Sequence, residues 1–229
     1  MPEQTSITLN HIAMVRFTEA YWDLAADRRA AMRQAWLAEV GAAAEAAHCY
    51  QLFGLEASHD LLLWTARRAA DPAVPDHFFA QWAAALAPHR QFVAVRETLW
   101  GFTQPSQYTK TRSTQELDPF APERMPYLIA YPFVKTTEWY AEDRETRQRL
   151  MGGHIKTGKQ YPDIRQLLLY SYGLQDQEFV VVYETADLLQ FLNLVRDLRG
   201  TEARRYTQRD WPLHSARLVR DPAELDRWL

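Results

Sequence analysis

An internal repeat constrains the fold of this chain more than any other feature of its sequence. FGLEASHDLLLW at 53–64 aligns with YGLQDQEFVVVY at 172–183, and each segment places a glycine turn before an apolar strand-like run. Around each segment the sequence pattern gives the order strand, helix, strand, strand, helix, strand. This order is the ferredoxin-like arrangement, so the sequence predicts two copies of one scaffold.

Hydrophobic periodicity and start signals place the elements of both copies. Ala-rich composition indicates the first helix, and Pro75-Asp76 marks the start of the second. In the first copy we expect strands at 7–17, 49–55, 60–66 and 91–102, and helices at 23–47 and 77–87. In the second copy we expect strands at 127–135, 166–172, 178–183 and 210–218, and helices at 142–153 and 187–199.

The segment 103–126 is rich in Pro, Ser, Thr and Gln and has no periodicity, so it is predicted to link the copies. The expected division is a first repeat at 1–102, this linker, and a second repeat at 127–229 that carries the ligand site. We expect the linker to fold over a ligand as a lid, because Tyr108, Lys110 and Arg112 suit carboxylates or phosphates.

The predicted fold class is α+β. Each copy should form a sheet with one face covered by its helices and the other face left for burial. Two such sheets facing each other form tandem ferredoxin-like repeats, the dimeric α/β-barrel arrangement. The sequence therefore predicts an eight-stranded barrel-like core with outer helices.

Charge and cysteine content exclude several classes of function. The formal net charge of -3 gives no electrostatic case for a nucleic-acid partner. Cys49 is the only cysteine, which excludes a disulfide framework and a thiolate metal cluster and fits a reducing cytoplasm. Neither a signal-like start nor a run of about 18 apolar residues occurs, so we expect a cytoplasmic protein without a membrane span.

His154 is the residue with the most suggestive surroundings. It lies at the end of the predicted helix 142–153, after the aromatic and cationic segment YPFVKTTEWY and before a predicted strand pair. A lone histidine at a helix end is commonly a capping cation or a satisfied core residue. Its flanking motifs instead favour a site for a flat, redox-active, anionic ligand.

Four motifs carry a resemblance to a known family: YPFVKTTEWY, GGHIKTGKQYP, YSYGLQDQEFVVVYET and LVRDLRGTEARRYTQRDWP. With them the chain resembles the chlorite dismutase family, haem proteins built from tandem ferredoxin-like repeats, and within it the coproheme decarboxylases. The resemblance covers 125–218 in motif and the first half only in architecture and length. It implies a hydrogen-peroxide-dependent oxidoreductase of haem biosynthesis that converts iron coproporphyrin III (coproheme), both substrate and redox centre, to haem b. It also implies a homo-oligomer, with a homopentamer favoured.

The resemblance assigns cofactor-binding roles to individual residues. His154 would be the axial ligand of the haem iron, and Glu202 would accept the hydrogen of its other ring nitrogen. Trp139 would line the haem edge, beside Tyr108 of the linker. The alternatives are ordinary ones: Trp139 as a core residue, or the whole chain as a non-catalytic haem-binding protein.

The resemblance also assigns catalytic roles to Tyr131, Lys135 and Gln166. By resemblance, Tyr131 takes a hydrogen atom from a propionate and Lys135 contacts that propionate; as positions i and i+4 of a strand, they share a face. Gln166 corresponds to the distal glutamine of several coproheme decarboxylases, where chlorite dismutases carry an arginine. A one-residue slip would instead put Arg165 in the pocket and favour a chlorite-decomposing enzyme or haem peroxidase.

Overall fold

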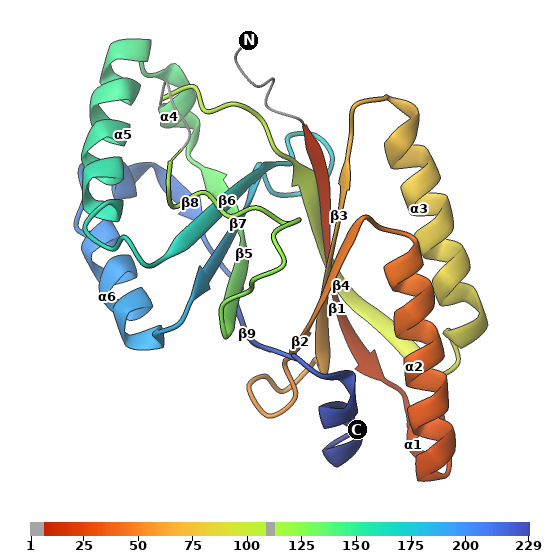
Figure 1. Cartoon of the computed structure of the whole chain (residues 1–229). Coiled ribbons are helices and arrows are strands. Elements are labelled where there is room, and N and C mark those ends of the chain that lie inside the picture. Colours follow the sequence, from red (N-terminus) through yellow and green to blue (C-terminus); the bar gives the residue numbers. More distant parts are fainter. Residues whose placement is uncertain (1–6, 109–112) are drawn as a thin grey trace.

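The computed structural model describes residues 7–108 and 113–229. Figure 1 shows a sheet in the middle of the molecule with a pair of long helices on each outer side. The first half contains β1 (Thr8–Phe17), α1 (Glu19–Trp22), α2 (Ala26–Ala42), β2 (Ala46–Gln51), β3 (Leu61–Arg68), α3 (Ala73–Leu86) and β4 (Val93–Phe102). The second half contains β5 (Tyr127–Lys135), α4 (Thr137–Ala141), α5 (Arg144–Gly158), β6 (Arg165–Tyr170), β7 (Phe179–Thr185), α6 (Leu188–Arg199), η2 (Glu202–Tyr206), β8 (Thr207–Arg209) and β9 (His214–Leu218).

The two halves have the same strand order. Within the described residues, neighbouring strands follow β4-β1-β3-β2 in the first half and β9-β5-β7-β6 in the second. Numbered within each repeat, both orders read 4-1-3-2. The halves join where β2 pairs with β9 and where β4 pairs with β6, so the strands form a closed ring. The predicted α+β fold of tandem ferredoxin-like repeats is confirmed.

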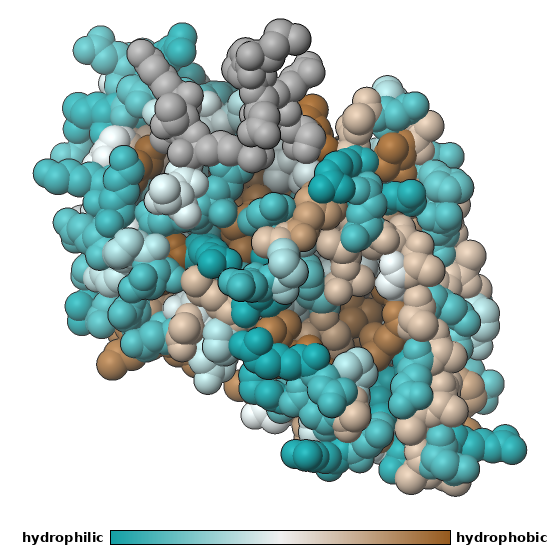
Figure 2. Space-filling view, viewed as in Figure 1, coloured by the Kyte–Doolittle hydropathy of each residue, from teal (hydrophilic) through white to brown (hydrophobic). Residues whose placement is uncertain are grey.

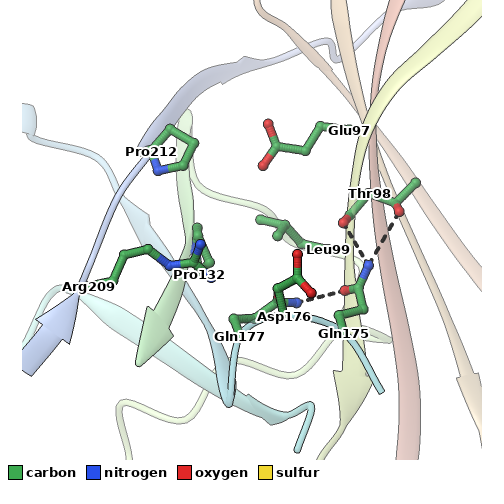
Figure 3. A pocket seen from close by; sticks show the side chains of 9 residues that line it. All are labelled: Glu97, Thr98, Leu99, Pro132, Gln175, Asp176, Gln177, Arg209 and Pro212. Atoms are coloured by element: carbon green, nitrogen blue, oxygen red, sulfur yellow. Dashed lines mark hydrogen bonds between the residues drawn. The ribbon is translucent and has the colours of Figure 1, made fainter. Parts of the chain in front are cut away.

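The seam between β4 and β6 is short, because Phe102 and Tyr170 form its one register pair among the described residues. Close approach is possible because Gly101 has no side chain: a Cβ atom there would lie 2.5 Å from the carbonyl oxygen of Tyr170. Further along, the Gln175 side chain replaces main-chain pairing. Its amide accepts from the Trp100 N–H at 2.9 Å and donates to the Thr98 carbonyl at 2.9 Å, the second contact being visible in Figure 3.

The interior of the ring is filled by side chains from both halves. Alternation along each strand sends every second residue inward. Burial of each large aliphatic side chain contributes about 1.5–3 kcal/mol, so this shared core holds the two repeats together. The inward residues are Ile12, Met14, Tyr50, Leu52, Leu62, Trp64, Leu99, Leu117, Leu128, Ala130, Leu167, Leu169, Val180, Val182, Ala216 and Leu218.

The outer face of each sheet is covered by helices, but not equally. α2 and α3 each bury three side chains, whereas α5 buries only Leu150. Figure 2 shows a mainly hydrophilic surface over α5. A helix of 15 residues with so little of its surface in the core is weakly packed against its sheet. On the outer face of β5, β6 and β7 the core contacts come from Phe191 and Leu194 of α6, and α5 covers this side of the sheet only loosely.

Several predicted boundaries were wrong. The first long helix ends at Ala42 rather than 47, because Ala46 and Ala47 pair with β3, and sheet pairing overrides the helix propensity of alanine. α3 begins at Ala73, so Pro75 lies in its first turn, where proline is tolerated.

Two further boundaries differ in the second half. α5 continues to Gly158, so His154 lies inside the helix rather than at its end. The last predicted strand, 210–218, begins at His214, with β8 formed separately by 207–209. Across 7–108 and 113–229, none of the helices has the length and apolar character needed to cross a bilayer. The division into 1–102, 103–126 and 127–229 stays a prediction.

Candidate functional site

A tyrosine pair lies on the outer face of the second sheet. Tyr131 on β5 packs outward, while its neighbour Ala130 points into the ring. Its ring stacks at 6.3 Å between centroids on that of Tyr183 from β7, and its hydroxyl donates to the Tyr183 hydroxyl. Burial, with the neighbouring Tyr183, holds the pKa of Tyr131 well above its ordinary value. Tyr131 is thus a protonated phenol with its hydrogen directed at a second phenol.

The structure separates Gln166 from Arg165. Arg165 pairs across the sheet with Glu184, whose carboxylate accepts from the inward Tyr50 hydroxyl at 3.2 Å. Residues directly opposite each other project from the same face, so Arg165 belongs to the ring interior. Gln166 is paired with Tyr183 and therefore projects toward the helices. Gln166 lies directly opposite Tyr183, and Tyr131 contacts Tyr183 diagonally, because the register partner of Tyr183 on β5 is Ile129. We call Gln166, Tyr183 and Tyr131 the polar row.

Lys135 is the last residue of β5, four positions after Tyr131. Its ammonium is 4.3 Å from the centroid of the Trp139 ring and 5.2 Å from that of Phe133. Burial lowers the pKa of Lys135 to about 8; nearby Glu178 opposes this shift and Arg204 reinforces it. No salt bridge to Lys135 exists within the part of the chain that the structure describes. A desolvated cation of this kind is suited to an anionic group of a ligand.

Trp139 is buried, in an aromatic cluster beside α5. Its ring contacts Tyr206 at 5.5 Å and Tyr108 at 6.4 Å, both edge-on. Leu150 of α5 and Ala203 of η2 complete the same cluster. The structure thus brings together two predicted ligand-binding residues, Trp139 and Tyr108, and places Lys135 on the face of the tryptophan.

His154 projects from α5 one turn beyond Leu150. Burial, together with the positive charge of Lys135, lowers the pKa of His154 to about 4. Its imidazole is therefore neutral at neutral pH and keeps a nitrogen lone pair free for a metal. Neither ring nitrogen has a hydrogen-bond partner among residues 7–108 and 113–229.

Glu202 is not placed as the resemblance implied. Its carboxylate accepts from Arg149 of α5 at 2.8 Å and lies 3.9 Å from Arg205, and its side chain is more than half exposed. For the described residues, no hydrogen bond joins Glu202 to His154. Arg149 satisfies the carboxylate, because a charged guanidinium is a stronger donor than a neutral imidazole.

The linker approaches the site from the side of β6. Residues 109–112 lie outside the described part, so the expected roles of Lys110 and Arg112 stay predictions. Further on, Leu117 donates its N–H to the Gln166 carbonyl at 2.9 Å. The Gln115 amide donates to the carbonyls of Tyr161 at 2.8 Å and Ile164 at 3.1 Å, after the end of α5. This part of the linker fixes the edge of β6 at the polar row.

One member of the polar row was missed by sequence reasoning. Tyr183 was assigned only to a strand, although VVVYE alternates so that Tyr183 and Val181 face opposite to Val182 and Glu184. That alternation identifies a shared face, but not its partners. The partners depend on the register of β7 with β5 and β6.

Comparison with known proteins agrees with this fold. A family model described as chlorite dismutase matches residues 14–219. A coproheme decarboxylase of Mycolicibacterium smegmatis is 28% identical over 166 residues, covering 71% of this chain and 68% of the relative. A coproheme decarboxylase of Staphylococcus saprophyticus is 32% identical over 164 residues, covering 67% and 65%. The structure of a chlorite dismutase of Candidatus Nitrospira defluvii in complex with imidazole matches with a TM-score of 0.77 at 24% identity, covering 98% of this chain and 95% of that one.

Proposed function

The chain belongs to the chlorite dismutase family, and on this premise we propose that it uses hydrogen peroxide to convert coproheme to haem b. The two curated relatives described above bear the name coproheme decarboxylase, which supports this choice within the family. The observation that carries the proposal is the polar row together with Lys135, on the same strand as Tyr131. It combines a phenol that can lose a hydrogen atom with a cation that can hold a carboxylate.

The described residues fit an iron porphyrin. His154 would bind the iron, because it is a neutral, partly buried imidazole whose ring nitrogens have no hydrogen-bond partner among the described residues. Trp139 and the weakly packed α5 offer an apolar wall for the macrocycle. The iron porphyrin supplies the redox chemistry by which hydrogen peroxide becomes an oxidant.

Tyr131 is the residue that oxidises the propionate in this proposal. It gives up one electron and its phenolic proton, and the resulting phenoxyl takes a hydrogen atom from the propionate side chain. The phenolic proton leaves through the hydrogen bond to the Tyr183 hydroxyl, which passes its own proton on at the same time, and it ends in one of the two waters formed from hydrogen peroxide. Each propionate, one hydrogen peroxide and one proton then give one vinyl group, one carbon dioxide and two waters. Hydrogen peroxide accepts the two electrons that the propionate loses.

Lys135 positions the propionate. Its ammonium is held over the Trp139 ring, which limits its freedom without neutralising its charge. A carboxylate that displaces the remaining water would form a charge-assisted hydrogen bond, worth about 1.5–3 kcal/mol. Because Lys135 and Tyr131 belong to one strand, the anchored carboxylate stays at the reactive edge of the site.

Gln166 favours decarboxylation over chlorite chemistry. A neutral amide can donate to a peroxide oxygen but brings no cation beside the iron. The alternative, a chlorite-decomposing enzyme or haem peroxidase, depended on Arg165 in the pocket, and the pairing of Arg165 with Glu184 speaks against that position. A non-catalytic haem carrier would have no need of the tyrosine pair.

Assembly and location complete the proposal. We expect a cytoplasmic homopentamer, as the family resemblance implies for a chain of this length. Sedimentation of the full chain measures the number of subunits.

A Tyr131→Phe variant tests the proposed function. It should bind coproheme as the wild type does but fail to release carbon dioxide, since phenylalanine lacks the phenolic hydroxyl that forms the phenoxyl radical. The product is followed by mass spectrometry of the porphyrin after addition of hydrogen peroxide. Tyr161→Phe is the matched control, because Tyr161 packs in the same cluster as Tyr131 but its hydroxyl donates to Asp197. Normal turnover by Tyr131→Phe would refute the mechanism, and oxygen release from chlorite would favour the alternative.

A further inference from the structure

A second cluster of metal-ligating side chains lies outside the porphyrin site. Glu56 and His59 come from the connection between β2 and β3, and His214 is the first residue of β9. The Nδ1 atom of His59 is 2.8 Å from Glu56 Oε2, and that of His214 is 3.0 Å from Glu56 Oε1. One ligand atom from each residue fits within 4.8 Å of the others. We call these three residues the His-Glu cluster.

Both histidines of the cluster are buried, Glu56 is partly buried, and the backbone around them is fixed. His59 is 8% exposed and His214 is 3% exposed. The Glu56 N–H donates to the Leu52 carbonyl at 2.9 Å, and Asp60, beside His59, donates its N–H to the Val15 carbonyl at 2.8 Å. The three side chains are thus held near one another before any ligand binds, which lowers the entropic cost of binding.

We propose that the His-Glu cluster binds a divalent transition-metal ion, with Zn²⁺ as the best match. Two imidazole nitrogens and one carboxylate oxygen are the ligand set of many zinc sites, which leave a fourth position open. With metal–ligand bonds of about 2.0–2.1 Å, tetrahedral geometry places ligand atoms roughly 3.3 Å apart. From the shared oxygen Oε2 of Glu56, the separations are 2.8 Å to Nδ1 of His59 and 3.2 Å to Nδ1 of His214, which are within a few tenths of an ångström of that value.

Glu97 supplies the outer partner that such a site requires. Its Oε2 lies 3.3 Å from Nε2 of His214, the ring nitrogen that faces away from Glu56. That nitrogen is buried and has no well-formed hydrogen bond in the described structure. A metal-ligating histidine commonly points its second nitrogen at a carboxylate, which orients the ring and raises its basicity. His214 therefore has one nitrogen for the metal and one for Glu97.

The outer partner Glu97 borders a cavity, and the three ligands come from both halves of the chain. Figure 3 shows Glu97 lining a cavity of about 370 Å³ between β4, β5 and the β6–β7 turn. His214 belongs to the second half of the chain, and Glu56 and His59 to the first. An ion at this point would cross-link the two repeats near the β2–β9 seam.

The test is zinc binding by the full-length chain, free of any affinity tag and stripped of metal. We expect isothermal titration with zinc sulfate to give one ion per chain, and cobalt(II) to give the absorption bands of a tetrahedral site. His59→Gln and Glu56→Gln should weaken binding by more than about tenfold, and Glu97→Gln by about 10- to 100-fold. His89→Gln is the control, because His89 is similarly buried and contacts Glu39 at 3.1 Å far from the cluster.

Two results would overturn the proposal: no stoichiometric zinc in the wild type, or equal affinity in the wild type, His59→Gln and Glu56→Gln. In either case the cluster is only a set of hydrogen bonds between two imidazoles and a carboxylate. Thermal unfolding of each metal-free variant shows whether the chain is folded, and Glu97→Gln tests the site without removing a ligand. A His154→Ala variant should keep its zinc affinity, which separates this proposal from the porphyrin site.

Discussion

Raising the pH from 7 to 9 should weaken coproheme binding by about tenfold through Lys135. Burial lowers the pKa of this ammonium to about 8 in the free protein. About ten chains in eleven then carry the cation at pH 7, and about one in eleven at pH 9. Only the protonated form attracts a propionate, which stays ionised throughout this range. Since apparent affinity scales with the competent fraction, the dissociation constant should rise roughly tenfold.

Two variants separate this effect from other titrations. Lys135→Arg keeps its charge above pH 9, so its affinity should not fall with pH through this group. Lys135→Met removes the charge-assisted hydrogen bond, about 1.5–3 kcal/mol, and should bind roughly 10- to 150-fold more weakly at pH 7. It too should lack the tenfold change between pH 7 and pH 9.

The assay is a titration of the porphyrin absorbance at pH 7, 8 and 9 and constant ionic strength. The difference in slope between the wild type and Lys135→Met isolates the contribution of the ammonium. Equal slopes in the two proteins would refute the reasoning, because the pH dependence would then come from another group.

Three further predictions concern the iron ligand, the distal face and the seam. His154→Ala should lose the absorption spectrum of imidazole-ligated iron, and added imidazole should restore it; an unchanged spectrum would exclude His154 as the ligand. Gln166→Ala should slow peroxide-dependent decarboxylation in stopped flow, whereas Arg165→Ala should leave the rate unchanged, because Arg165 faces the ring interior; the reverse pattern would restore the chlorite alternative. Gly101→Ala should cost about 1–3 kcal/mol, because the new Cβ would lie 2.5 Å from the Tyr170 carbonyl oxygen. Calorimetry should show a fall of about 2–4 °C in Tm per kcal/mol, and an unchanged Tm would contradict the close contact.

The order of strands and helices was predictable because it depends on local periodicity. Runs such as LLLW and VVVY indicate buried strands wherever they occur in the chain. The end of α2 was not predictable in the same way. Ala46 and Ala47 favour a helix locally, and only their pairing with β3 makes them a strand.

The site residues likewise include some that local periodicity predicts and some that only strand pairing places. The common face of Tyr131 and Lys135 follows from the two-residue period of one strand. The choice between Gln166 and Arg165 does not follow from that period. Adjacent strand residues point to opposite faces, and the period does not say which of the two faces the ring interior. The register of β6 with β7 makes that choice by setting Arg165 opposite Glu184. Glu202 shows a further limit, since its pairing with Arg149 on α5 depends on how η2 packs.

The sequence by itself determined two ferredoxin-like repeats, a helix next to His154, and a strand carrying Tyr131 and Lys135. These features depend on neighbours within a few residues, which the pattern of side chains records directly. Only the tertiary structure decided the polar row and the His-Glu cluster. The cluster joins Glu56 and His214, which are 158 residues apart. Ring closure through the β2–β9 and β4–β6 seams brings such residues together, and no local pattern encodes that contact.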